Sequence, residues 1–401
     1  MAGAGIGELD GTLLDGRYLV ESRIASGGTS TVYRGLDIRL DRPVAVKVMD
    51  ARYACDEQFL TRFRLEARSV ARLKDPGLVA VYDQGLDARH PFLVMELVEG
   101  GTLRELLAER GPMPPHAVAA VLRPVLGGLA AAHGAGLVHR DVKPENVLIS
   151  DEGDVKIADF GLVRAVAAAG ITSASVMLGT AAYLSPEQVR DCPPNQASPR
   201  SDVYSTGILT YELLTGRTPF TGDSALSIAY QRLDSDVPPA GAAIDGVPPQ
   251  FDELVRRATA RNPADRYADA VEMAAELEAI ADELGLPGFR VPAPSNSAQH
   301  RSAALQHSRM AERRTAPVHQ PTRQLTRGPG DWPAAQPRVE PDEYEYGPAT
   351  GEFAGIAMSE FVWARQRGRR MVLIWVAVLL ALTGLVATVG WTIGSNLSGL
   401  L

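Results

Sequence analysis

Residues 139–161 read H-R-D-V-K-P-E-N-V-L-I, then the acidic turn S-D-E-G-D, then V-K-I-A-D-F-G. Three side chains of defined chemical use stand in this segment at fixed spacing. Asp141 offers a carboxylate that can accept or orient a hydroxyl proton. Asn146 is a neutral oxygen ligand and Asp159 a charged oxygen ligand for a hard cation. A charged hairpin loop between two strands would account for any one of these residues, but not for all of them in this order.

The order H-R-D-x-K-x-x-N followed by D-F-G resembles the catalytic and metal-binding loops of protein kinases. The resemblance covers residues 16–284 and implies a bilobal α+β kinase fold, with a small β-rich N-lobe and a larger helical C-lobe. It implies catalytic roles for Asp141 and Lys143, and metal ligation by Asn146 and Asp159. It also implies ATP and Mg²⁺ as cofactors, with Mn²⁺ as the alternative metal.

Residues 18–35 alternate in polarity on both sides of a small-residue turn, as the strands of a hairpin do. By resemblance this turn covers the phosphates, and the family pattern G-x-G-x-x-G-x-V falls on Ala25, Gly27, Ser30 and Val32. Only the middle glycine is kept, although alanine and serine are small enough for backbone N–H groups to approach phosphate oxygens. An ordinary hairpin turn remains the alternative. The resemblance assigns nucleotide contacts to Ile24, Ala25, Ser26, Gly27, Gly28, Thr29, Ser30, Thr31 and Val32.

The apolar strand expected over residues 43–49 carries one lysine, Lys47. Lysine is scarce here: Lys47, Lys74, Lys143 and Lys156 are the only four. Lys47 matches the kinase strand lysine that pairs with the α- and β-phosphates, and the resemblance counts it among the catalytic residues. An ordinary edge lysine is the alternative.

The helix expected over residues 57–73 places Phe59 and Phe63 at helical spacing. Glu66 lies on this helix. By resemblance it pairs with Lys47 in the active state and contributes to the nucleotide site. A solvated helix glutamate is the alternative.

Residues 91–101 predict a buried strand that ends in a glycine turn. By resemblance this segment joins the two lobes, with Met95 at the back of the adenine pocket. Backbone groups of Glu96 and Val98 then face the adenine edge. The resemblance assigns the apolar walls of this pocket to Ile24, Val32, Ala45 and Leu148.

Further kinase-like features lie on both sides of the catalytic segment. Ser185 begins S-P-E where kinases have A-P-E, and the resemblance implies a buried ion pair between Glu187 and Arg266. It also implies that Asp202 braces the catalytic loop. His133, on the helix expected over residues 116–135, is interpreted as structural.

Two features indicate a serine or threonine acceptor by resemblance. Lys143 lies two residues beyond Asp141, where it can neutralise the transferring phosphoryl group, and Thr180 is expected to bond to the catalytic Asp and Lys.

Three hydroxyl residues, Thr172, Ser173 and Ser175, are the expected regulatory phosphosites. A phosphoryl group there can order the loop by pairing with an arginine, and Arg140 directly precedes the catalytic aspartate. We expect autophosphorylation at this cluster, with Thr172 slightly favoured.

Composition limits the class of partner. The net charge of −8 argues against nucleic acid as the main partner. The two cysteines, Cys55 and Cys192, show no metal or disulfide spacing, which fits a reducing compartment. Residues 1–15 are glycine-rich, are expected to be flexible and carry no signal-peptide pattern, so the N-terminus is expected in the cytoplasm.

Residues 290–370 are rich in Pro, Gln, Ser, Thr and Arg, and we expect a disordered basic juxtamembrane linker over residues 285–370. Thr315, Thr322 and Thr326 lie near arginines and are candidate docking points for a phosphothreonine-reading adaptor. A tether with incidental threonines is the alternative.

Residues 371–393 carry no charge over 23 positions, long enough for a helix to span about 30 Å of hydrocarbon. Arginines at 365, 367, 369 and 370 precede them, so the positive-inside rule predicts a cytoplasmic kinase domain and an extracytoplasmic tail at 394–401. The whole resembles the membrane-anchored actinobacterial group of Hanks-type serine/threonine kinases.

That short tail leaves no room for an extracellular sensor, so activation is expected from upstream kinases, homodimerisation or the membrane helix. Proteins are the expected substrates. A pseudokinase that binds nucleotide without turnover is the competing class, favoured only by Ala25 and Ser30.

Overall fold

The computed structural model describes residues 9–160, 181–190, 197–304, 352–353 and 356–357. The chain divides into two compact units, Met1–His319 and Gln320–Leu401. In the second unit the described residues form one antiparallel pair, β10 (Glu352–Phe353) with β11 (Ile356–Ala357). The first unit holds both lobes of the expected kinase domain.

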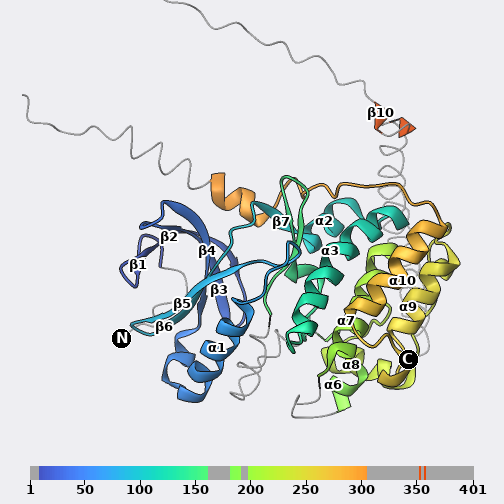
Figure 1. Ribbon diagram of the computed structural model, residues 1–401, viewed down its shortest axis with the longest axis horizontal. Helices are drawn as coiled ribbons and strands as arrows, with labels where there is room; N and C mark the ends of the chain where they lie inside the picture. The colour runs from blue at the N-terminus through green and yellow to red at the C-terminus, as the bar shows by residue number, and fades with distance from the viewer. Residues whose placement is uncertain (1–8, 161–180, 191–196, 305–351, 354–355, 358–401) are drawn as a thin grey trace, which may run out of the picture. The chain divides into compact units, whose positions relative to one another are not determined.

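The small lobe is built on a six-stranded antiparallel sheet with the strand order β1-β2-β3-β4-β6-β5 (Figure 1). The expected hairpin is β2–β3 and the expected lysine strand is β4, which buries every residue from Val44 to Met49. The strands are Leu13–Leu14 (β1), Tyr18–Ser26 (β2), Ser30–Asp37 (β3), Arg42–Met49 (β4), Val81–Asp87 (β5) and His90–Met95 (β6).

One helix, α1 (Glu57–Val70), belongs to the small lobe. Asp56 caps it by accepting a hydrogen bond from the Phe59 amide at 2.9 Å. Phe59 and Phe63, one helical turn apart, are buried and stack on each other. The helix predicted from this spacing is confirmed, and it ends three residues earlier than expected.

The large lobe is mostly helical and carries a small sheet of strand order β7-β8-β9. Helix α7 is buried continuously from Ser201 to Thr215, and both α3 and α9 pack against it. The bilobal kinase fold is therefore confirmed. Its elements are β7 (Gly100–Thr102), α2 (Leu103–Arg110), α3 (Pro115–Gly134), β8 (Val147–Ser150), β9 (Val155–Ile157), α6 (Pro186–Arg190), α7 (Pro199–Thr215), α8 (Ala225–Asp234), α9 (Pro249–Ala258) and α10 (Ala270–Glu283).

Helix α3 is the one helix in the described part of the chain that is long and apolar enough to cross a membrane. More than half of its apolar stretch is buried inside the large lobe, where it packs against α10, so it serves as a core helix. The membrane helix predicted at 371–393 and the tail at 394–401 lie outside the described residues, as does most of the predicted linker.

The structure differs from the sequence prediction at the start of that linker. Residues 285–304 are described and pack on the kinase lobes, and Val291, Ser297 and Ser302 are at most 3% exposed. The prediction of a disordered segment from residue 285 onward is therefore wrong for its first twenty residues. Their polar composition predicted disorder because such a segment cannot form a core of its own. In the structure these residues are instead packed against the surface of the kinase lobes.

Candidate active site

The catalytic loop lies between α3 and β8, and its polar groups converge on Asp141. Lys143 Nζ lies 2.9 and 2.7 Å from the two carboxylate oxygens of Asp141. Asn146 Nδ2 donates to the Asp141 carbonyl at 2.7 Å and to its carboxylate at 3.0 Å. These bonds direct the side-chain nitrogen of Asn146 toward Asp141. The side-chain oxygen of Asn146 therefore points away from Asp141, where it can bind a cation.

The loop is held from beneath by Asp202 of α7, as predicted. Its carboxylate accepts the backbone N–H groups of His139 and Arg140, both at 2.7 Å, and also bonds His133 Nε2 at 2.9 Å. His133 in turn accepts the Ala270 amide at 3.3 Å, so it links three elements and is structural as interpreted. Asp202 is fully buried and these bonds satisfy its charge.

Two non-glycine residues adopt left-handed backbone conformations here, Arg140 with φ 72° and Asp159 with φ 68°. Such conformations cost about 1–3 kcal/mol each and persist where surrounding bonds over-determine them. His139 provides that constraint, because its ring accepts the Asp141 amide at 3.2 Å and bonds the Ala158 carbonyl at 2.8 Å. The Ala158 amide also donates to the Asn146 carbonyl, so the catalytic and metal-binding loops form one connected piece.

Asp159 forms an ion pair with Lys47, at 2.8 Å between Oδ2 and Nζ. Burial by itself would raise the pKa of Asp159, but the charge and hydrogen bond of Lys47 outweigh it and hold that pKa below its usual range. The Asp159 carboxylate is therefore negative at neutral pH, as a cation ligand must be.

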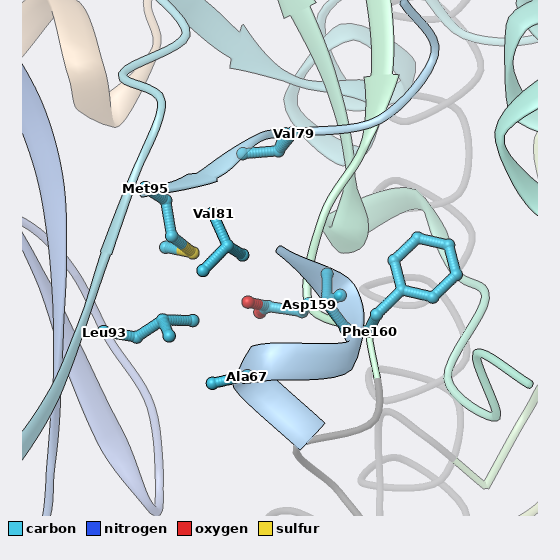
Figure 2. Close-up of a pocket in the computed structure, with 8 residues that line it drawn as sticks. Ala67, Val79, Val81, Leu93, Met95, Asp159 and Phe160 are labelled. Atoms are coloured by element: carbon cyan, nitrogen blue, oxygen red, sulfur yellow. The ribbon is translucent and has the colours of Figure 1, made fainter. Parts of the chain in front are cut away.

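The expected Lys47–Glu66 pair is not formed in this structure. Among the described residues the only ion pair of Lys47 is with Asp159. A small cavity lined by Ala67 and Met95 lies between α1 and the sheet. Figure 2 shows apolar side chains pointing into it around Asp159. Lys47 thus pairs with the carboxylate of the metal-binding loop in this structure.

The expected adenine walls come together in one apolar cluster. Ala45 and Met95 are buried in it, and Val32, Val98 and Leu148 pack against them. The Glu96 amide donates to the Ala80 carbonyl at 2.8 Å. Within the described residues the Val98 amide has no such acceptor, so it is available to a ligand. Ile24 lies on β2 and is half-buried.

The small-residue turn is a true hairpin turn between β2 and β3. Gly27 N–H donates to the Ser30 carbonyl at 2.8 Å, and Ser26 and Thr31 are cross-strand partners. Ala25 to Gly28 are exposed, whereas Thr31 is fully buried and so faces the lobe. The turn therefore leaves its backbone open to solvent, as contact with phosphates requires.

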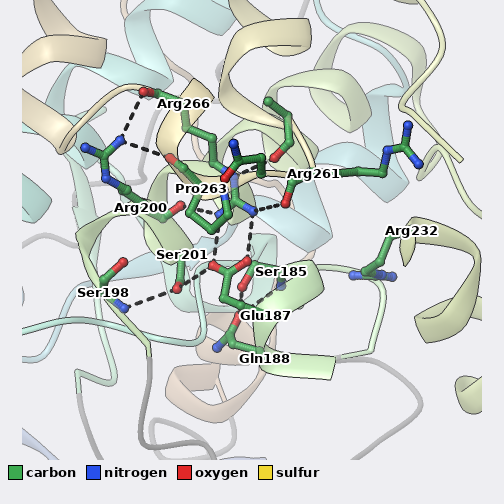
Figure 3. A network of polar contacts seen from close by, with 12 residues as sticks. Ser185, Glu187, Gln188, Ser198, Arg200, Ser201, Arg232, Arg261, Pro263 and Arg266 are labelled. Atoms are coloured by element: carbon green, nitrogen blue, oxygen red, sulfur yellow. Dashed lines mark hydrogen bonds and ion pairs between the residues drawn. The ribbon is translucent and has the colours of Figure 1, made fainter. Parts of the chain in front are cut away.

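The predicted ion pair between Glu187 and Arg266 is confirmed and is bidentate, at 2.9 and 2.8 Å (Figure 3). Arg266 is fully buried. Burial alone would raise the pKa of Glu187, but Arg266 outweighs it and keeps that pKa below the ordinary value. Ser185 also has a role there: its N–H and hydroxyl both donate to Gln188 at 2.9 Å, which closes the start of α6.

Sequence reasoning missed two polar links around the site. Lys156 pairs with Glu96 at 3.0 Å, joining β9 to the segment between the lobes. Arg104 bonds Glu145 of the catalytic loop at 2.8 Å and Glu212 of α7 at 2.6 Å. The scarcity of lysine was a usable signal for the first link. The second joins residues far apart in sequence, without a local pattern.

The activation-loop residues Thr172, Ser173, Ser175 and Thr180 lie outside the described residues. Their expected roles are therefore carried forward as predictions.

The fold is bilobal, one loop holds an aspartate, a lysine and an asparagine in contact, and a lysine–aspartate ion pair involves the segment joined to that loop. This combination defines a protein kinase. Residues 18–277 match the protein kinase domain model, and the chain belongs to this family.

It is a serine/threonine protein kinase. Over 396 residues it is 76% identical to the serine/threonine-protein kinase PknL of Mycobacterium tuberculosis, covering 98% of each chain. The crystal structure of the PknI kinase domain of that organism matches 70% of this chain and 99% of that one, with TM-score 0.54 and 26% identity. A structure of Rad53 in complex with AMP-PNP matches 64% of this chain and 63% of that one, with TM-score 0.52 and 26% identity.

Proposed function

We propose that this chain is a membrane-anchored kinase that transfers the γ-phosphoryl group of ATP to serine or threonine hydroxyls of proteins in cytoplasmic signalling. One observation carries the catalytic part of the proposal: Asp141, Lys143 and Asn146 are bonded to one another, and a backbone bond joins their loop to the segment that holds Asp159, the partner of Lys47. Positioning and charge stabilisation are what phosphoryl transfer needs from a protein.

Each residue has a distinct task in this scheme. Asp141 orients the acceptor hydroxyl and takes its proton, and Lys143, already on that carboxylate, offsets the charge of the transferring group. Lys47 supplies the positive charge for the α- and β-phosphates. The presence of Lys143 beside Asp141 supports serine and threonine as acceptors.

The adenine site fits ATP. An apolar slot between Ala45, Val98 and Leu148 would hold the flat base, and the Val98 amide would donate to its edge. AMP-PNP, bound in the related Rad53 structure, is an ATP analogue and supports the same nucleotide class here.

The metal site fits Mg²⁺ brought with the nucleotide. No group of three or more His, Cys, Asp and Glu side chains suited to a metal occurs in the described part of the chain. Mg²⁺ is usually held by one or two protein groups together with substrate phosphates and water, and Asn146 and Asp159 would be those groups. When bound at Asn146 and Asp159, Mg²⁺ would supply positive charge that offsets the negative charge of the phosphates. Mn²⁺ shares the preference for oxygen ligands and is the alternative.

We expect autophosphorylation on Thr172, Ser173 or Ser175. Incubation of the chain with Mg-ATP should add 80 Da phosphate groups within residues 170–178, because this segment lies between the metal-binding loop and Glu187. Mass spectrometry of the parent and of Lys47→Met checks it. Unmodified residues 170–178 in a catalytically active preparation would refute the expectation.

We expect residues 371–393 to anchor the chain, because 23 uncharged residues follow an arginine cluster. In fractionated cells the full chain should sediment with membranes and resist carbonate extraction. A chain ending at residue 370 should stay in the soluble fraction. Recovery of the full chain in the soluble fraction would rule the anchor out. Upstream kinases, a phosphothreonine-reading adaptor and a homodimer remain predicted partners.

A further inference from the structure

The segment after α10, residues 286–304, crosses from the large lobe to the small lobe, and we call it the strap. In Figure 1 it runs from the end of α10 past α3 and α2 and ends in a short helix beside the small lobe. The described part of this helix covers residues 298–304.

The first part of the strap is anchored on the large lobe. Val291 is 3% exposed and belongs to the large-lobe core, and the Phe289 ring packs edge-on against His116 of α3. Arg290 and Val291 also pack over Gly153, where a Cβ would lie 2.7 Å from the Arg290 side chain. Apolar burial fixes this end.

The middle part is bonded to α2, just after the segment that joins the lobes. Ser295 donates its amide and its hydroxyl to the Glu109 carboxylate, at 2.8 and 2.9 Å. One Glu105 oxygen accepts the Ala298 amide at 2.7 Å while the other accepts the Thr102 amide at 2.9 Å. A single carboxylate therefore serves the N-termini of two helices, α2 and the strap helix, where negative charge is favoured.

The far end reaches β2 of the small lobe. The hydroxyls of Ser302 and Ser22 are hydrogen-bonded at 2.7 Å, and the two residues are only 2% and 4% exposed. Ser297 caps the strap helix by accepting the His300 amide at 2.9 Å, and His300 bonds Asp151 of the large lobe at 2.9 Å. The same short helix thus contacts both lobes.

We propose that the strap fixes the small lobe over the catalytic loop, so that displacing it loosens β2 and weakens nucleotide binding. The strap is continuous with residues 305–370, so any partner or tension acting on that segment acts on the position of the lobes. Only one readout of this proposal, the KM for ATP, rests on the proposed kinase function. The other, amide hydrogen exchange, reports on the strap whether or not the chain transfers phosphate.

The test compares two matched variants of the full chain. Ser302→Asp introduces a charge into the buried contact with Ser22, whereas Ala304→Asp adds the same charge at an exposed position of the same helix. We expect amide exchange in residues 298–304 and in β2 to rise about tenfold in Ser302→Asp, since local opening there becomes easier. The KM for ATP should rise about threefold or more while kcat stays within about twofold. Ala304→Asp should match the parent.

A second pair approaches the strap from the other side. A Cβ at Gly101 would lie 2.4 Å from Pro294 and 2.6 Å from Ser297, whereas a Cβ at Gly134 meets nothing within 4 Å. Gly101→Ala should reproduce the exchange and KM changes, and Gly134→Ala should not. The proposal would be overturned if Ser302→Asp and Gly101→Ala speed amide exchange in the strap but leave exchange in β2 and the KM for ATP unchanged. It would also be overturned if neither of these two variants changes exchange or KM. Loss of all phosphoryl transfer in the parent would instead count against the function, while leaving the exchange test intact.

Discussion

Replacing Asp141 by asparagine is expected to lower kcat for phosphoryl transfer by about 10²–10⁴, the usual contribution of a positioned proton acceptor. Asparagine keeps the shape of the side chain and an oxygen for Lys143, which contacts both carboxylate oxygens at 2.7 and 2.9 Å. The proton acceptor is lost while the loop stays in place. The KM for ATP should stay within about twofold, because Asp141 acts on the acceptor hydroxyl rather than on the nucleotide. Steady-state kinetics with labelled ATP measures both quantities.

The matched control is Asp154→Asn, in the exposed turn between β8 and β9. It makes the same chemical change away from the loop and should leave kcat unchanged. Retention of more than about one-tenth of parental kcat in Asp141→Asn would show that Asp141 isn't the proton acceptor.

Glu187→Ala is expected to give the largest loss of stability. It leaves the fully buried Arg266 guanidinium without its carboxylate, and breaking such a pair costs about 3–5 kcal/mol. For a domain of this size that corresponds to a fall of about 6–20 °C in Tm. Differential scanning calorimetry measures it. Glu253→Ala, which breaks an exposed pair with Arg256, should change Tm by less than about 4 °C. Equal shifts in the two variants would contradict the argument from burial.

The same pair predicts an acid dependence. The pKa of Glu187 is lower in the folded protein than its ordinary value of 4.5. Its contribution to stability is therefore fully present above that value and is lost as pH falls through the lower, folded pKa. Lowering the pH below 4.5 should narrow the difference in Tm between the parent and Glu187→Ala. A difference that widens on acidification would reverse the sign and refute this assignment.

Local motifs made the catalytic loop predictable. Asp141, Asn146 and Asp159 lie in one short segment, and their spacing reflects a loop whose groups must meet one another. The buried strand with Lys47 and the helix with Phe59 and Phe63 followed from periodicity, because each buries one face or both. Glu187 and Arg266 were paired by family resemblance across 79 residues, and the structure confirms them.

Contacts set by the arrangement of the lobes were not predictable. Lys47 bonds Asp159, which follows β9 of the large lobe, rather than Glu66, and no residue pattern along the chain encodes which of these two carboxylates it pairs with. The strap was misread as linker because its composition is polar. Its order comes from Val291 in the core of another element and from carboxylates on α2, which a scan along the chain does not detect.

The most direct test of the central claim is transfer of labelled γ-phosphoryl from ATP by the full chain with Mg²⁺, beside Lys47→Met. The account predicts label on the parent and on a serine- or threonine-containing protein substrate, and none with Lys47→Met, because that variant removes the charge paired with Asp159 at the nucleotide site. A parent that binds ATP but transfers no label would contradict it and would identify a pseudokinase, with Ala25 and Ser30 of the small-residue turn as the first residues to restore to glycine.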